Sequence, residues 1–136
     1  MALLLDTCAL LWIADDAPLS KSAVEAIDKA QDEGDPLLLS PITAWEIGLL
    51  VSSGRIALPA TPQAWFDRVT RAPKLRLIGL SAGVLLASSF LPGRPPRDPA
   101  DKIIIATARD GDLTVVTRDR LILSYGEAGH VRSLAC

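Results

Sequence analysis

The chain has 136 residues, of which nearly half are apolar, so it is long enough for one domain with a sizeable core and is not disordered. No apolar run approaches the ~18–20 residues that a membrane span requires. The net charge of −2 divides unevenly, with two basic and nine acidic side chains in residues 1–53 and twelve basic and seven acidic ones in residues 54–136.

Short apolar runs alternate with helical patterns along the chain, which is typical of a parallel sheet covered by helices. The first run, Leu3–Leu5, predicts a buried strand. Four more strands are expected at residues 37–39, 75–80, 113–116 and 131–134. No repeat, low-complexity tract or long linker divides the chain. Residues 1–136 are therefore expected to form one α/β domain with a single open, mainly parallel five-stranded sheet flanked by helices.

Capping residues mark the starts of the helices between these strands. Ser20 or Ser22 is expected to cap a helix that runs to Ala30, and Ser22 has Glu25 three residues on as a capping box. Ser81 predicts another helix that runs to about residue 90. A capping oxygen also stands before a proline, which the first turn of a helix tolerates, at residues 40–41, 61–62 and 98–99.

The amino terminus and the cysteines indicate the compartment. The apolar run Ala2–Leu5 follows the first Met and meets Asp6 at once, so it does not have the form of a signal peptide. Cys8 and Cys136 have no metal-binding spacing and are expected to be free thiols. We therefore expect a cytoplasmic protein that does not associate with a membrane.

Two acidic residues follow predicted strands. Asp6 comes directly after the first strand, and Asp119 follows the strand at 113–116. Ligands of open parallel sheets bind beyond the carboxyl ends of the strands, so both residues are candidates for a site. Each also has a structural explanation that stays open at this point. Asp6 can cap a helix that starts near Thr7, and Asp119 can form an Asx turn.

Two more acids lie on the predicted inward faces of helices. Glu46 belongs to the helix 41–53, and its neighbours at helical spacing are apolar, namely Ile42, Leu49 and Leu50. A carboxylate in such a stripe loses water unless a cation or donor meets it, and the alternative is an edge position that reaches solvent. Asp101 likewise shares an apolar face in the helix that starts at Pro99. Asp98 precedes that helix, either as its cap alone or also as a ligand.

The four acids, Asp6, Glu46, Asp101 and Asp119, can therefore converge at one edge of the sheet. Carboxylates within a few ångströms repel one another strongly, and hard cations such as Mg²⁺ or Mn²⁺ neutralise them through oxygen ligands. The single histidine, His130, is expected at the surface or in a turn, and no His/Cys group favours zinc. The sequence therefore predicts a magnesium or manganese site.

Four segments of the chain resemble the successive acidic motifs of PIN-domain nucleases, and more narrowly those of the VapC-type toxins of bacterial toxin–antitoxin pairs. They are Leu4–Thr7, Trp45–Ile47, Asp98–Ala108 and Val116–Asp119. The match runs along the whole chain, and the order and spacing of the motifs make it specific. The resemblance implies a PIN fold, endoribonuclease activity that depends on Mg²⁺ or Mn²⁺, a homodimer, and a cognate antitoxin that binds over the active site.

The resemblance also assigns roles to individual residues. By motif position, catalysis and metal binding fall to Asp6, Glu46, Asp101 and Asp119, and Thr7 and Thr117 supply supporting hydroxyls. Cys8 and Pro96 depart from the family, because many relatives have His at these two positions. Neither position is one of the acids, so the departures bear on the choice of RNA and not on activity.

Cleavage of RNA would use a metal-bound water that attacks phosphorus in line. Lys102, Arg118 and Arg120 adjoin the acids in sequence and are either contacts to flanking phosphates or solvated surface charges. The basic second half of the chain permits an anionic partner, although such a division is more often two solvated faces. The few aromatic residues form no ladder for stacking a long single strand.

Other classes of protein also place acids at the ends of parallel strands. A receiver-type signalling domain has adjacent acids after its first strand and an Asp that closes the middle strand, where this chain has Gly79–Ser81. A small-molecule phosphatase has Asp-x-Asp after the first strand, where this chain reads Asp6–Cys8. A binding module that keeps the scaffold without turnover is the remaining alternative.

Overall fold

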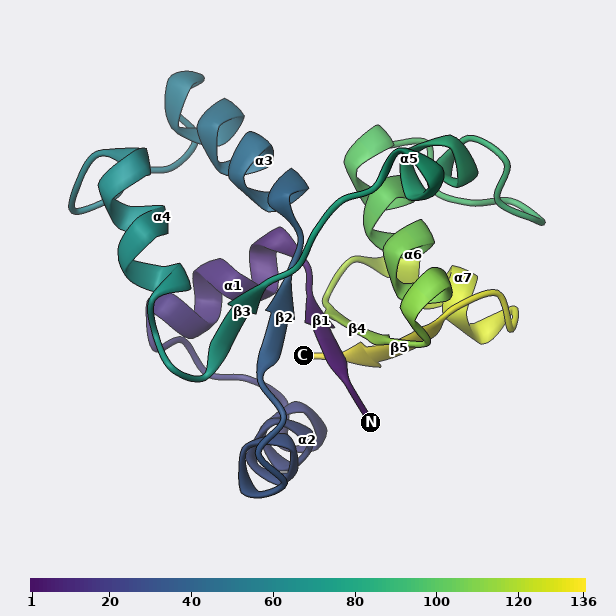
Figure 1. The fold of residues 1–136 in the computed structure, drawn as a ribbon, viewed down its shortest axis with the longest axis horizontal. Coiled ribbons are helices and arrows are strands. Elements are labelled where there is room, and N and C mark those ends of the chain that lie inside the picture. The colour runs from purple at the N-terminus through teal and green to yellow at the C-terminus, as the bar shows by residue number, and fades with distance from the viewer.

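The computed structural model describes all 136 residues, which form one five-stranded sheet and the helices around it (Figure 1). All neighbouring strands are parallel, in the order β3-β2-β1-β4-β5, so the predicted open α/β sheet is confirmed. The strands are β1 (Leu3–Leu5), β2 (Leu37–Leu39), β3 (Leu75–Leu77), β4 (Thr114–Thr117) and β5 (Arg132–Ala135).

The strand at residues 75–80 is shorter than predicted. It ends at Leu77, because the chain leaves the sheet after the amide of Ile78 donates a last hydrogen bond to the carbonyl of Leu39. The segment from there leads to the cap of the next helix at Ser81. The first half of the apolar run 75–80 forms the predicted strand, whereas its second half connects the sheet to α5.

Helices cover both faces of the sheet (Figure 1). One face carries α1 (Thr7–Ala14), α2 (Lys21–Asp32), α3 (Pro41–Ser52) and α4 (Pro62–Thr70). The other carries α5 (Ala82–Ser88), α6 (Pro99–Gly111) and α7 (Arg120–Glu127). No helix is long and apolar enough to cross a lipid bilayer.

Each face of the sheet has its own hydrophobic core, and this explains the unbroken apolar run of β1. Successive side chains of a strand point to opposite faces. Leu3 and Leu5 therefore pack in the core under α1–α4, and Leu4 packs with Ile104 and Ile122 in the core under α6 and α7. Because both faces are buried, no position of β1 is free to be polar.

The predicted capping residues lie at the helix starts. Ser40, Thr61, Ser81 and Asp98 each accept a hydrogen bond from an amide in the first turn of their helix. These bonds satisfy amide groups that have no partner inside the helix. The hydroxyl or carboxylate before each proline therefore fixes where its helix begins.

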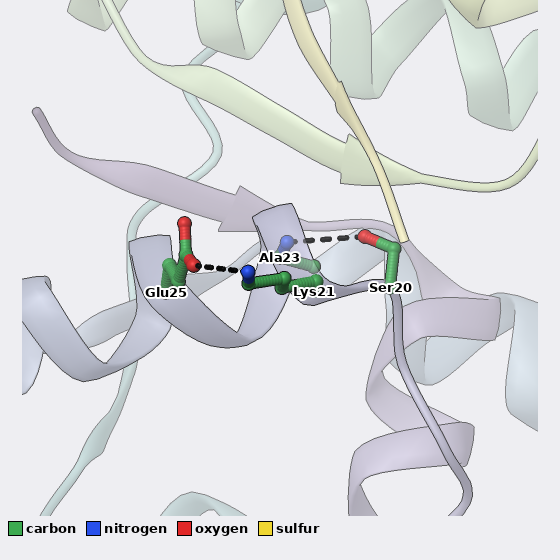
Figure 2. Close-up of polar contacts among 4 residues, drawn as sticks. All are labelled: Ser20, Lys21, Ala23 and Glu25. Atoms are coloured by element: carbon green, nitrogen blue, oxygen red, sulfur yellow. Dashed lines mark hydrogen bonds and ion pairs between the residues drawn. The ribbon is translucent and has the colours of Figure 1, made fainter.

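Of the two possible caps of α2, the structure uses Ser20 (Figure 2). Its Oγ accepts the amide of Ala23 at 3.1 Å and donates to the carbonyl of Ala135 at 2.8 Å, which ties the helix start to β5. Ser22 lies inside the helix, so the capping box with Glu25 does not form. Glu25 instead lies 3.9 Å from the amine of Lys21, one turn earlier.

One helix, α7, was not predicted. Its cap is Asp119, which the sequence analysis placed either in a ligand site or in an isolated turn. Ile122 and Tyr125, three residues apart, are its buried side chains and pack against the core beside α6. The segment is short, and its apolar residues Leu121, Ile122 and Leu123 are consecutive, so they do not show helical spacing.

Candidate active site

The carboxyl ends of β1 and β4 lie side by side in the middle of the sheet. The chain passes from β1 to β2 on one side, whereas β4 lies on the other side of β1, so the strand order reverses at this point. Ligands of open α/β sheets bind at such a position. Asp6 directly follows β1, and Asp119 lies two residues beyond β4.

A pocket of about 330 Å³ opens at this edge of the sheet. The four predicted acids line it together with five other residues, namely Thr7, Cys8, Trp12, Asp98 and Arg118. A larger hollow of about 780 Å³ lies beside the amino ends of β4 and β5, and it contains none of these acids. The position at the strand switch and the concentration of carboxylates favour the smaller pocket as the functional one.

Asp6 both caps helix α1 and lines the pocket. Only 6% of its surface is exposed. Its Oδ1 accepts the amide of Ala9 at 2.7 Å, as the N-cap of α1, and its Oδ2 accepts the hydroxyl of Thr117. Burial raises the pKa of Asp6, the two hydrogen bonds lower it, and the charge of Asp119 raises it again. Asp6 is therefore the cap of α1, as one of the two explanations predicted, and it also lines the pocket.

Glu46 reaches the pocket from α3 and is held by a hydroxyl. Thr7 Oγ1 donates to Glu46 Oε1 at 2.5 Å, and the buried hydroxyl of Thr43 lies 3.2 Å from that of Thr7. Burial raises the pKa of Glu46, and the hydrogen bond from Thr7 opposes this shift. The expected inward apolar face of α3 is only partly right, because Leu49 is 48% exposed and Glu46 lies at the border of the buried side.

Asp101 is the carboxylate with the most strongly perturbed environment in the pocket. Burial raises its pKa to about 7, with further contributions from the charges of Asp98, Asp119, Glu46 and Asp6. No hydrogen bond offsets these effects. The side chain lies in the first turn of α6, next to buried Ala100 and one turn before buried Ile104 and Ile105, as the sequence predicted. A positive charge near Asp101 would therefore be strongly favoured.

Asp98 and Asp119 cap helices in the same manner. Asp98 Oδ1 accepts the amides of Ala100 at 2.8 Å and Asp101 at 3.3 Å. Asp119 Oδ1 accepts the amides of Leu121 at 2.9 Å and Ile122 at 3.0 Å. Both also line the pocket, so capping does not remove either carboxylate from it.

The donor set of the pocket fits a hard divalent cation. Five carboxylates face one small volume, and burial together with mutual repulsion raises the pKa of Asp6, Glu46 and Asp101. No three acidic, histidine or cysteine side chains lie close enough to form a ready-made set of ligands. Hydrogen bonds hold four of the carboxylates, namely Glu46, Asp6, Asp98 and Asp119, in their positions.

The three basic residues that adjoin the acids in sequence separate in the structure. Only Arg118 lines the pocket; Lys102 and Arg120 do not. The pocket also contains Trp12 and Cys8, which the sequence analysis did not assign to it. Trp12 lies on α1 six positions after Asp6, and no motif marks it. Partial burial of the Cys8 thiol and then the charges of the nearby acids raise its pKa to about 11.

Comparison with known proteins gives a consistent result. The family model of the PIN domain matches residues 3–127. The chain is 33% identical over 117 residues to "Ribonuclease VapC22" of Mycobacterium tuberculosis, covering 86% of this chain and 85% of the relative.

Two solved structures show the same fold. One is a chain of VapBC2 from Rickettsia felis bound to a DNA fragment from their promoter, with a TM-score of 0.68, 15% identity and coverage of 99% of this chain and 98% of that one. The other is a chain of a toxin–antitoxin complex from Klebsiella pneumoniae, with a TM-score of 0.53, 21% identity and coverage of 88% and 87%.

Proposed function

The chain belongs to the PIN-domain family and is a homologue of the VapC ribonucleases, and we propose that it is a metal-dependent endoribonuclease that acts as the toxin of a toxin–antitoxin pair. The observation that carries this proposal is the pocket at the strand switch, which five carboxylates line and where burial and the charges of neighbouring acids raise the pKa of Asp101 to about 7. The relative that is named a ribonuclease supports RNA as the substrate.

We assign metal binding and catalysis to four residues, Asp6, Glu46, Asp101 and Asp119. A bound divalent cation lowers the pKa of a water molecule and shields the negative charge of a phosphodiester. The carboxylates supply the negative charge that holds the cation. The hydroxyls of Thr117 and Thr7 fix the orientation of Asp6 and Glu46 through their hydrogen bonds. Loss of such a supporting hydrogen bond commonly lowers metal affinity or activity by roughly 10–100-fold.

The choice of metal follows from the donors. Both Mg²⁺ and Mn²⁺ bind carboxylate oxygens, and the pocket contains no histidine that would favour zinc. We propose that either ion supports the reaction. Asp98 is treated as the cap of α6, because the resemblance to the acidic motifs of the family assigns the ligand role to Asp101 and not to Asp98.

The proposal includes two protein partners. The likeness of fold to chains from toxin–antitoxin complexes supports a cognate antitoxin. A homodimer is supported by large apolar side chains that the single chain leaves exposed, among them Leu86 at 68% and Phe90 at 83%. Residues 1–136 are taken as one PIN domain that acts on RNA in the cytoplasm.

The proposal is tested with purified protein freed of its antitoxin. We expect cleavage of RNA when Mg²⁺ or Mn²⁺ is present and none in excess EDTA. In cells, expression of the chain alone should arrest growth, and co-expression of the antitoxin should restore it. A chain that neither arrests growth nor cleaves RNA under these conditions is not a ribonuclease toxin.

A further inference from the structure

Arg118 is the one cation among the residues that line the acidic pocket. It forms no ion pair with any of the five carboxylates there, since the ion pairs of the chain all lie elsewhere. Its guanidinium instead lies over the indole ring of Trp12, with Cζ 3.9 Å from the ring centroid. An Nη2–H group donates to the carbonyl of Pro18 at 2.6 Å. Arg118 is therefore held beside the acids without neutralising them.

This arrangement leaves the charge of Arg118 available to a ligand. Trp12 packs against the core on the α1 side, and this packing fixes the indole ring on which the guanidinium lies. The residue as a whole is exposed, and a guanidinium has five N–H donors in one plane, so donors remain free beyond those that contact Pro18 and Cys136. Because the side chain is already fixed, less conformational entropy is lost when an anion binds.

The lining of this pocket carries mostly negative charge, which an RNA phosphate must approach to be cleaved. Five carboxylates repel it, and Arg118 is the residue of the lining that attracts it. A planar guanidinium can donate two parallel hydrogen bonds to one phosphate, which a lysine amine cannot. Lys102 and Arg120 do not line the pocket and cannot replace it there.

We propose that Arg118, braced by Trp12, binds an RNA phosphate adjacent to the scissile one and so positions the substrate beside the acids. This inference rests on the proposed ribonuclease function and adds a specific residue pair to it. Arg118 contacts the substrate, whereas Trp12 acts through Arg118 and is a positioning residue.

A purely structural role for the pair makes different predictions. If Arg118 served only to connect Trp12 with the segment around Pro18, its removal would lower the melting temperature and leave the salt dependence of RNA binding unchanged. A phosphate contact instead contributes to the salt dependence, because binding releases counterions from the RNA. The slope of log Kd against log salt concentration therefore separates the two roles.

The experiment measures binding of a short fluorescently labelled single-stranded RNA by anisotropy, in EDTA, at several salt concentrations. For Arg118→Ala we expect a Kd about tenfold or more higher than that of the parent, as for a lost hydrogen bond to a charged group. The slope should fall by about 0.7, the contribution of one phosphate on a single strand. Arg120→Ala, with an exposed arginine outside the pocket, is the matched control and should show no comparable loss.

Two further variants keep the test decisive if Arg118→Ala is poorly folded. Arg118→Lys keeps the charge, so the slope should remain while Kd rises. Trp12→Leu also keeps the charge and should raise Kd without changing the slope, whereas Trp12→Phe should restore most of the affinity.

Equal Kd and equal slope for the parent and Arg118→Ala, in protein that cleaves RNA with metal, would overturn the inference and leave the ribonuclease function intact. A parent protein that neither binds nor cleaves RNA would overturn both.

Discussion

The hydroxyl of Thr117 donates a hydrogen bond to the carboxylate of Asp6, although the two residues lie 111 positions apart in the chain. The parallel register of β1 and β4 pairs Leu5 with Val116 and so brings the two residues together at the ends of their strands. The same hydroxyl accepts the amide of Asp119 at 2.9 Å. One fully buried side chain therefore positions the acids that follow both strands.

The first prediction concerns Thr117→Val, which removes the hydroxyl while keeping the shape of the side chain. The hydrogen bond from Thr117 lowers the pKa of Asp6, so its loss should raise that pKa further. A higher pH is then needed to ionise Asp6. We expect cleavage to fall by roughly 10–100-fold and its acidic limb to move to higher pH, measured as rate against pH at saturating metal.

Thr114→Val is the matched control, on the same strand. The hydroxyl of Thr114 is buried and has no hydrogen-bond partner, so its replacement removes an unsatisfied polar group. The free energy of unfolding should rise by about 1 kcal/mol, with no change in the pH profile. Equal shifts of the profile for both valine variants would show that the bond to Asp6 has no special role.

A second prediction follows from the raised pKa of Asp101. In the folded protein without metal this pKa is about 7, against an ordinary value of 3.8, so between these values the folded state binds more protons than the unfolded state. Its stability must therefore fall as pH rises through this window, and it is highest below it. Asp6 and Glu46 are shifted in the same direction.

Thermal denaturation in EDTA from pH 4 to pH 8 measures this effect. The melting temperature of Asp101→Asn should fall less over this range than that of the wild type, and at pH 8 it should be equal or higher. A large loss of stability in Asp101→Asn at every pH would show instead that the carboxylate supports the fold.

Most of the fold could be predicted from the sequence, because local sequence patterns mark most of its strands and helix starts. Both faces of β1 are buried, so three leucines in a row marked it, and a capping oxygen before Pro41 and Pro99 marked two helices. The end of β3 was missed because Ile78 continues the apolar run after the chain has left the sheet. The choice between Ser20 and Ser22 depended on a bond to β5 that no local pattern contains.

The candidate site could be predicted only in part from the sequence. The acids could be placed at strand ends and inward helix faces, but the hydrogen bonds from Thr117 and Thr7 depend on the register between strands and on how α1 packs against α3. The stacking of Arg118 on Trp12 joins residues far apart in the chain. Such contacts arise from tertiary packing, so no spacing rule in one sequence identifies them.

A third prediction separates Asp98 from Asp101. Asn also caps helices, so Asp98→Asn should keep the bonds to the first turn of α6 and retain most of the activity. Asp98→Ala should lose about 1 kcal/mol of stability. Asp101→Asn should be inactive at saturating RNA, because the amide cannot supply the missing negative charge. Were Asp98→Asn as inactive as Asp101→Asn, with weaker binding of Mn²⁺, Asp98 would be a metal ligand.

A fourth prediction uses Cys8 as a reporter of charge in the pocket. The pKa of its thiol is raised to about 11 by burial and then by the charges of Asp6, Glu46, Asp101 and Asp119. Removing one of these charges in Asp101→Asn should lower that pKa. Alkylation by iodoacetamide at pH 8 should then be faster, since the thiolate is the reactive form.

Mass spectrometry of the peptide that contains Cys8 measures the alkylation rate, with Cys136 replaced by Ala to leave one thiol. Asp112→Asn, an exposed acid outside the pocket, is the control and should react like the wild type. An equal rate in Asp101→Asn and the control would place Asp101 too far from Cys8 to share the pocket.

The central claim is that the acidic pocket holds the divalent cation needed to cleave RNA. Its most direct test is the initial rate of cleavage of one RNA as a function of free Mn²⁺ concentration, for the wild type and for folded Asp101→Asn. We predict no cleavage in EDTA, a saturable rise with Mn²⁺ for the wild type, and no rise for Asp101→Asn. Undiminished cleavage in EDTA, or the same Mn²⁺ dependence in both proteins, would contradict the claim.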